Sequence, residues 1–242
     1  MLKQYLEYVQ HALEMTVNEQ EGQLSRAARM LANTIENDGI IYVFGSGHSA
    51  LMAEEGFYRA GGLGCVCPML VSELMLHDAA VKSTTLEKME ELASEILIRY
   101  PISEKDTVIV CSSSGINGLP VEIARLTQAM QTKVICISSG AYKTSESLHT
   151  SGKQLKDYCD VWLNDFAPYG DACLSVGKKN AKMGPISTIT GCYLLNALLL
   201  EASYLADADG FSPVVYTGCA IENGQENNVE IIERYRDRIR HL

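Results

Sequence analysis

Two short segments rich in glycine and serine are the part of this sequence best suited to chemistry. The first follows the apolar run 40–44 and reads Gly45, Ser46, Gly47, His48 and Ser49. The second follows the run 107–111 and reads Ser112, Ser113, Ser114 and Gly115. Where a buried strand ends in such small residues and a helix follows, backbone N–H groups and hydroxyls can point at an anion. We therefore predict a site for a phosphorylated small molecule.

Each segment also has an alternative interpretation. The segment 112–115 fits an ordinary strand–helix connection whose serines cap the helix. The segment 45–50 fits GxGxx[G/A], the pattern of dinucleotide-binding loops, which calls for an acidic residue about 20 residues further on, at the end of the second strand. The first carboxylate after that strand is Glu73, which comes late and beyond the strand. A dinucleotide-dependent oxidoreductase is therefore the weaker hypothesis.

The elements that position these segments alternate between strands and helices. Apolar periodicity and turn residues predict strands over 40–44, 65–70, 107–111, 133–138 and 161–164. They predict helices over 2–35, 49–60, 86–100, 120–131, 185–206 and 227–240. Near-continuous apolar strands separated by helices are typical of a parallel sheet covered on both faces, an α/β fold. Ligands of such sheets bind beyond the carboxyl ends of the strands, where both glycine–serine segments fall.

Composition favours one enzyme-sized domain over residues 1–242, with a helical N-terminal extension over 1–36 and a C-terminal helix over about 227–240. The formal net charge is −10 and no basic cluster occurs, which argues against nucleic acid or an anionic membrane as the partner. The apolar stretch 186–200 is too short to span a bilayer and is predicted to be a buried helix. The eight cysteines include no CxxC pair, so free thiols in a reducing cytoplasm are expected.

The predicted opening helix has a consequence for assembly. A straight helix over residues 2–35 would be about 50 Å long, more than the width of one small domain. Its apolar stripe would then pack against a second copy of the chain, giving a homodimer. The alternative is a helix kinked back over its own sheet near Glu21 and Gly22.

The glycine–serine loop after the first strand, the serine loop after the third and the helix-rich α/β order together resemble the sugar isomerase (SIS) domain family. The resemblance covers about residues 30–210, and the segments 149–153, 167–172, 184–188 and 223–235 are similar to stand-alone SIS proteins. It implies a three-layer fold with a five-stranded parallel sheet flanked by helices. It also implies binding or isomerisation of phosphosugars, and dimers with sites near the interface. No cofactor and no metal are implied.

The resemblance assigns roles to individual residues. The phosphate would be held by the loop of Ser112, Ser113, Ser114 and Gly115 with Ser49 and Ser46, while Asn117 stands where the family often has threonine. Glu73 lies in Ser72-Glu73-Leu74, which occupies the place of the Ser-Glu-Phe segment that supplies a catalytic glutamate in glutamine:fructose-phosphate amidotransferases. One poised carboxylate can move the proton that aldose–ketose isomerisation requires, so Glu73 is the expected general base. A solvated carboxylate at a helix start is the alternative.

Three histidines are candidates for the same site. His48 lies inside the first loop, where an imidazole could open a sugar ring, or it could simply cap a helix. His149 belongs to a segment after the fourth strand that reaches the carboxyl edge of the sheet, so contact with substrate is expected. His77 follows Glu73 by four residues and is expected to be exposed. A metal held by Glu73, His48 and His77 has suitable ligand types but no supporting spacing.

These observations predict a cytoplasmic phosphosugar-binding protein. The favoured activity is an aldose–ketose isomerase, or a related enzyme, acting on a sugar phosphate or an amino-sugar phosphate. A non-catalytic sugar-phosphate sensor is the alternative, and the oxidoreductase is weaker still.

Overall fold

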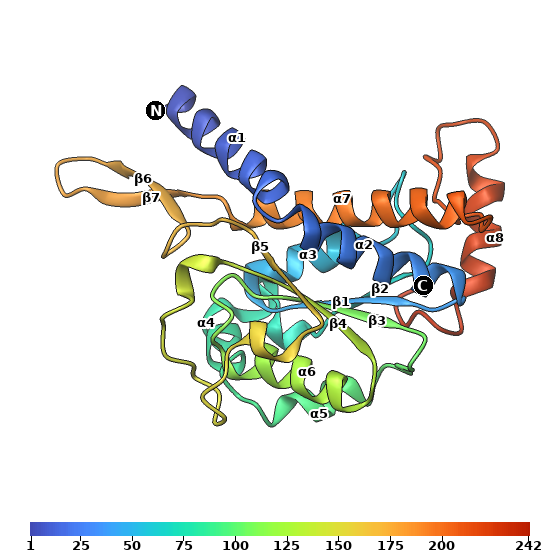
Figure 1. The fold of residues 1–242 in the computed structure, drawn as a ribbon, viewed down its shortest axis with the longest axis horizontal. Helices are drawn as coiled ribbons and strands as arrows, with labels where there is room; N and C mark the ends of the chain where they lie inside the picture. Colours follow the sequence, from blue (N-terminus) through green and yellow to red (C-terminus); the bar gives the residue numbers. More distant parts are fainter.

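A computed structural model describes residues 1–242, and its centre is a five-stranded parallel sheet (Figure 1). The strand order is β2-β1-β3-β4-β5. The strands are β1 (Ile41–Gly45), β2 (Val66–Met69), β3 (Thr107–Cys111), β4 (Lys133–Ser138) and β5 (Val161–Asn164). Every residue of β1, β2 and β3 is buried, as expected for a parallel sheet with both faces covered.

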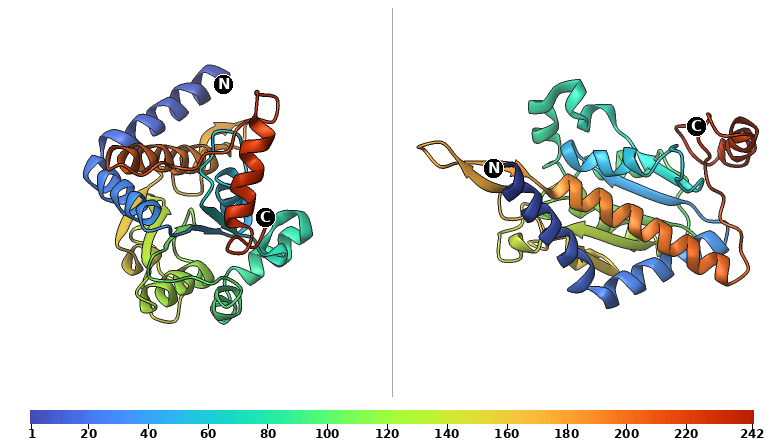
Figure 2. Two further views of the ribbon diagram at one scale, coloured as in Figure 1. Left: turned by 90° about the vertical axis from the view of Figure 1, so that its right-hand side faces the viewer. Right: turned by 90° about the horizontal axis from the view of Figure 1, so that it is seen from above.

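Helices cover both faces of this sheet, which makes three layers (Figures 1 and 2). On one side lie α1 (Leu2–Asn18), α2 (Glu21–Glu36), α3 (Ala50–Glu55) and α7 (Ser187–Ala208). On the other side lie α4 (Leu76–Leu86), α5 (Leu92–Leu97) and α6 (Gly118–Ala129). The last helix, α8 (Gly224–Tyr235), packs at the end of the molecule near the C-terminus, and short 3₁₀ turns cover Gly47–Ser49, Ser72–Leu74, Gly140–Tyr142 and Leu155–Tyr158. The predicted α/β fold is confirmed.

The prediction of one continuous helix over residues 2–35 is wrong. The chain breaks at Gln20, whose backbone has φ −147° and ψ 31°. The Gln20 side chain donates to the carbonyl of Asn164 and accepts from its N–H, both at 2.8 Å, so this amide pairs with the edge strand β5. The break lets α2 lie on the sheet while α1 crosses over α7. The kinked alternative therefore holds, with the kink one residue before Glu21.

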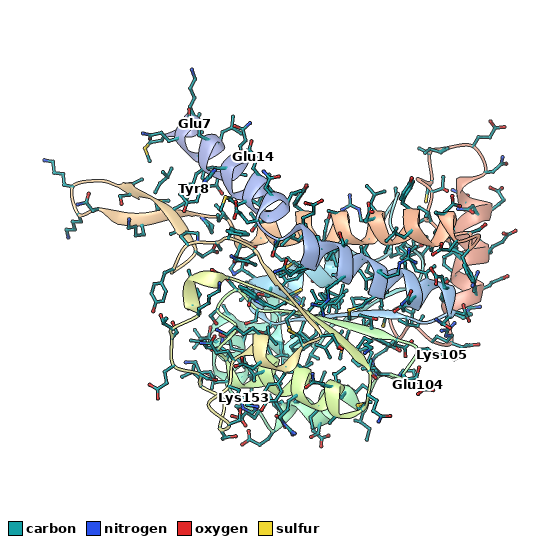
Figure 3. The ribbon with its side chains drawn as sticks, in the orientation of Figure 1. Glu7, Tyr8, Glu14, Glu104, Lys105 and Lys153 are labelled. Carbon is teal, nitrogen blue, oxygen red and sulfur yellow. The ribbon has the colours of Figure 1, made fainter.

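A hairpin that the sequence did not predict projects from the body beside α1 (Figures 1 and 2). It pairs β6 (Ala172–Val176) antiparallel with β7 (Ala181–Pro185). Its turn contains two residues with left-handed backbone, Gly177 at φ 69° and Asn180 at φ 51°. Figure 3 shows Tyr8 on the side of α1 that faces this hairpin, and both Tyr8 and Cys173 of β6 pack against the small cluster of Ala12, Ala167 and Ile186.

Several boundaries also differ from the prediction. The helix expected over 49–60 ends at Glu55, and the helix expected over 86–100 is represented by α5 alone. Helix α4 and the hairpin lie in segments with no predicted element. The last helix begins at residue 224 rather than 227.

Helix α7 has 22 residues and is long and apolar enough to cross a membrane by length and composition. The expectation that this stretch is too short therefore does not hold. In the fold, 44% of its most apolar window is buried, and it packs against α2 and α3. It serves as a core helix of this domain.

The strand order brings the two glycine–serine segments together. Strands β1 and β3 are neighbours, and Gly45 pairs with Cys111 at their carboxyl ends. The chain runs outward from β1 to β2 on one side and from β3 to β5 on the other, so the gap between β1 and β3 is the switch point of the sheet. Ligands of open α/β sheets bind at this point.

Candidate functional site

A cavity of about 420 Å³ opens at the switch point, beyond the carboxyl ends of β1 and β3. Most of its lining residues are polar; Leu76 and Tyr142 are the two hydrophobic ones, and Pro185 lines it as well. The two loops supply Ser46, Gly47, His48, Ser49, Ser112, Ser113, Ser114 and Asn117. The remaining lining residues are Ser83, Thr84 and Glu87 at the end of α4, and Gly170, Asp171, Ser187 and Thr188 at the root of the hairpin and the start of α7. None is a lysine or arginine.

The first loop needs glycine at two positions. A Cβ at residue 45 would overlap the carbonyl group of Ser49, because the chain folds back tightly over the end of β1. Gly47 has φ 54°, a left-handed conformation that side chains disfavour. The resulting turn brings His48 and Ser49 to the cavity wall, and the Ser49 hydroxyl has no partner within the protein. Gly45 itself shapes the loop without lining the cavity.

The second loop uses one of its serines for its own turn. The Ser112 hydroxyl accepts from the N–H of Gly115 at 3.3 Å, and Gly115 has φ 65°. The hydroxyls of Ser113 and Ser114 have no partner within the protein, and both residues are half-buried at the cavity wall. Helix α6 begins directly after this loop, and the N-terminus of a helix favours an anion. Ser113 and Ser114 are therefore the hydroxyls best placed to hold a phosphate.

Glu87 is one of the cavity residues that the sequence analysis did not assign to the site. It caps the C-terminal end of α4, and its Oε2 accepts from the Ser46 hydroxyl at 3.1 Å. Burial raises the pKa of Glu87, and the hydrogen bond from Ser46, the charge of Lys88 and the side chain of Asn117 oppose that rise. A carboxylate at this end of a helix faces the negative end of the helix dipole. No sequence signal identified it, because the prediction placed Glu87 at the start of a helix over 86–100 rather than at the C-terminal end of α4.

Asp171 fixes the part of the cavity wall formed by the root of the hairpin and the start of α7. One oxygen accepts from the N–H groups of Ile186 and Ser187 at 3.0 and 2.8 Å, and the other accepts from the Ser187 hydroxyl at 2.8 Å. The carboxylate therefore caps the start of α7 and joins the root of the hairpin to that helix.

The expected general base lies outside this cavity. Glu73 sits in the 3₁₀ turn Ser72–Leu74, is exposed and is not among the lining residues. His77 is exposed as well, so these two residues and His48 do not form a cluster of metal ligands. Of the two expected catalytic residues, the structure brings only His48 to the cavity.

His149 also lies outside the cavity, in a separate buried cluster. Its Nε2 is 2.9 Å from Glu122 Oε2 and 3.4 Å from Glu90 Oε2. The N–H of Ser151 donates to Nδ1 at 3.1 Å, so in the neutral ring Nε2 carries the proton and donates to Glu122. His149 therefore links its loop to α6, and the expectation that it contacts a cavity-bound substrate finds no support in its position. Arg125 and then His149 hold the pKa of Glu122 below its usual range against the effect of burial.

Comparisons with known proteins decide the family. The family model described as "SIS domain" matches residues 4–139, more than half of the chain. This chain belongs to the SIS domain family. A UPF0309 protein of Thermoanaerobacter pseudethanolicus is 38% identical over 247 residues, which covers all of both chains. A UPF0309 protein of Listeria innocua is 36% identical over 240 residues, covering 99% of this chain and 97% of the other.

Solved structures of other proteins share the fold. A phosphoheptose isomerase from Francisella tularensis superimposes with a TM-score of 0.55 at 15% identity, covering 83% of this chain and 95% of the other. The Vibrio vulnificus NanR protein, complexed with ManNAc-6P, superimposes with a TM-score of 0.53 at 15% identity. The match covers 96% of this chain and 68% of the other. The five-stranded parallel sheet flanked by helices is therefore confirmed as the architecture of this SIS protein.

Proposed function

We propose that this SIS protein binds a phosphorylated sugar in the switch-point cavity and interconverts its aldose and ketose forms. The observation that carries the proposal is the set of unpartnered hydroxyls, those of Ser49, Ser113 and Ser114, which face one polar cavity beside the start of α6. Hydroxyl and N–H donors can satisfy phosphate oxygens without a cation. The names of the Francisella isomerase and the NanR complex agree with a sugar phosphate as ligand.

His48 is the proposed proton-transfer group, because it lines the cavity and an imidazole can donate or accept near neutral pH. Isomerisation moves a proton from the carbon beside the carbonyl to the carbonyl carbon, and ring opening needs a proton at the ring oxygen. Glu73 fits the role of general base only in a site that a second copy of the chain completes, since within one chain it is exposed.

A homodimer is part of this proposal. Large apolar side chains are exposed along α1 and α7, namely Leu2, Leu6, Ile189, Tyr193, Leu200 and Tyr204. Helix α7 starts at the cavity, so a copy packed on this face would lie close to the site.

One observation favours the non-catalytic sensor as the second candidate. The carboxylate expected to act as general base, Glu73, is outside the cavity. The cavity within one chain is therefore suited to a protein that binds a sugar phosphate without turnover. The dinucleotide hypothesis is weaker still, since β2 ends at Met69 and Leu70 and Val71 follow where an acidic residue would contact a ribose.

A thermal-shift panel of sugar phosphates tests the proposed binding. At a hundredfold excess over Kd, a bound ligand should stabilise the wild type by about 2.7 kcal/mol. Ser114→Ala should weaken that ligand about tenfold or more, because it removes a hydrogen bond to a charged group. Ser175→Ala, on the exposed face of β6, is the matched control and should bind like the wild type.

The outcome against the proposal is a panel in which no sugar phosphate raises the melting temperature, or a ligand whose affinity Ser114→Ala leaves unchanged. For a ligand that binds, Glu73→Gln then separates the candidates for the general base. If turnover survives this change, Glu73 does not act in proton transfer.

A further inference from the structure

The phosphate ester of an uncharged sugar would leave the negative charges in this cavity unbalanced. A phosphate monoester brings about −1.5 to −2 charges at pH 7. The lining residues add two carboxylates, Glu87 and Asp171, and no lysine or arginine. A ligand of this cavity that carried only the phosphate would place several negative charges in one partly enclosed space.

The two carboxylates differ in what they can still bind. Asp171 already accepts three hydrogen bonds from the start of α7, where the helix dipole also stabilises its charge. Glu87 accepts one hydrogen bond, from the Ser46 hydroxyl at 3.1 Å, and lines the cavity together with Asn117, whereas an ionised carboxylate offers about four acceptor positions. Glu87 is also partly removed from water and sits at the unfavourable end of α4. The neighbouring Lys88 is exposed and does not line the cavity, so Glu87 is the carboxylate with no counter-charge inside the cavity.

We propose that Glu87 binds a cationic amino group of the ligand, so that the substrate class is an amino-sugar phosphate with a free amine. This inference rests on the proposed sugar-phosphate function and narrows it. An ammonium group donates up to three hydrogen bonds and balances the carboxylate, whereas a hydroxyl supplies one hydrogen bond and no charge. N-acetylation removes the charge, so the cavity distinguishes the free amine from both its acetylated and its hydroxyl counterparts.

The position of Glu87 limits where that amine can be. Glu87 accepts from Ser46 in the first loop and lines the same cavity as Asn117, directly after the second loop, so it lies beside the loops that face the phosphate. One small molecule must therefore carry the phosphate and the amine together. A hexosamine phosphate meets this requirement.

Isothermal titration with matched ligands tests the proposal, with EDTA present so that no divalent cation can bridge phosphate and carboxylate. The ligands are the 6-phosphates of glucose, galactose and mannose, each compared with its 2-amino-2-deoxy and 2-acetamido-2-deoxy forms. At pH 7 we expect at least one amine to bind about tenfold or more tighter than its two counterparts, in the range of a charge-assisted hydrogen bond. Glu87→Gln should abolish that preference and leave the affinity for the hydroxyl sugar phosphate equal or higher.

The control is Glu91→Gln, since Glu91 is exposed and outside the cavity, and it should keep the preference for the amine. Equal binding of all three forms by the wild type overturns the inference while the proposed function stands, and this comparison needs no variant to fold. A uniform loss for all ligands in Glu87→Gln, with melting temperature unchanged, also overturns it, because Glu87 would then act on a part that the ligands share. Failure of every ligand to bind overturns the proposed function itself.

Discussion

Gly45→Ala should destabilise the protein by about 3 kcal/mol and weaken binding of a sugar phosphate about a hundredfold or more. A methyl group at residue 45 would overlap the carbonyl of Ser49 and lie 2.8 Å from the backbone nitrogen of Ala50. Both neighbours are backbone atoms, so they can move only if the turn over residues 46–49 opens. That turn carries His48 and Ser49 to the cavity. Chemical denaturation and titration of a ligand from the panel measure the two effects.

Gly22→Ala is the matched control for this substitution. Gly22 lies in α2, where an added Cβ meets no atom within 4 Å, so alanine should stabilise the protein by about 0.5–1 kcal/mol and leave binding unchanged. A Gly45→Ala protein with the stability and affinity of the wild type would show that the first loop does not build the site.

Asp165→Asn should change how stability depends on pH. Asp165 is 1% exposed, and burial raises its pKa to about 7, opposed by a hydrogen bond from the N–H of Ala167. In the unfolded chain the group titrates near about 3.9. Between these two pH values the Asp165 carboxyl holds a proton in the folded state and has lost it in the unfolded state. The stability that this protonation contributes is therefore complete below about pH 4 and is lost as the pH rises to 7.

The loss amounts to about 1.4 kcal/mol for each pH unit, and up to about 4 kcal/mol in all. Asparagine does not titrate, so free energies of unfolding from pH 5 to pH 8 should fall in the wild type and fall less in the variant. Glu104→Gln is the control, because Glu104 lies on the exposed loop before β3 (Figure 3) and should leave the profile unchanged. Parallel profiles for the wild type and Asp165→Asn would show that this carboxyl does not hold its proton in the folded state.

The strands and the two loops were predictable because their signals are local. The runs 107–111, 133–138 and 161–164 are strands with the predicted bounds, since each is an apolar run flanked by turn residues. The parallel pairing of β1 with β3 places Gly45 beside Cys111. Because both strands end there, the two loops meet in one cavity.

The remaining differences come from contacts distant in sequence. The break at Gln20 depends on an amide pair with Asn164, 144 positions away, which no periodicity can show. Segment 76–86 mixes small and polar residues without a clear apolar stripe, so α4 was not predicted, and Glu87 was assigned to the start of a later helix instead of the end of α4. Glu73 and His149 were chosen on the family resemblance. In the structure Glu73 is exposed and His149 pairs with Glu122, so neither lines the cavity within one chain.

The most direct test of the account is a crystal structure of the protein with the sugar phosphate that gives the largest thermal shift. We predict that the phosphate oxygens accept hydrogen bonds from the hydroxyls of Ser113 and Ser114, beside the turn that carries Ser49. A second cavity, of about 310 Å³, lies at the other end of the molecule and contains Arg234. A phosphate bound there by the guanidinium, with the serine loops empty, would contradict the claim that neutral donors at the switch point hold the ligand.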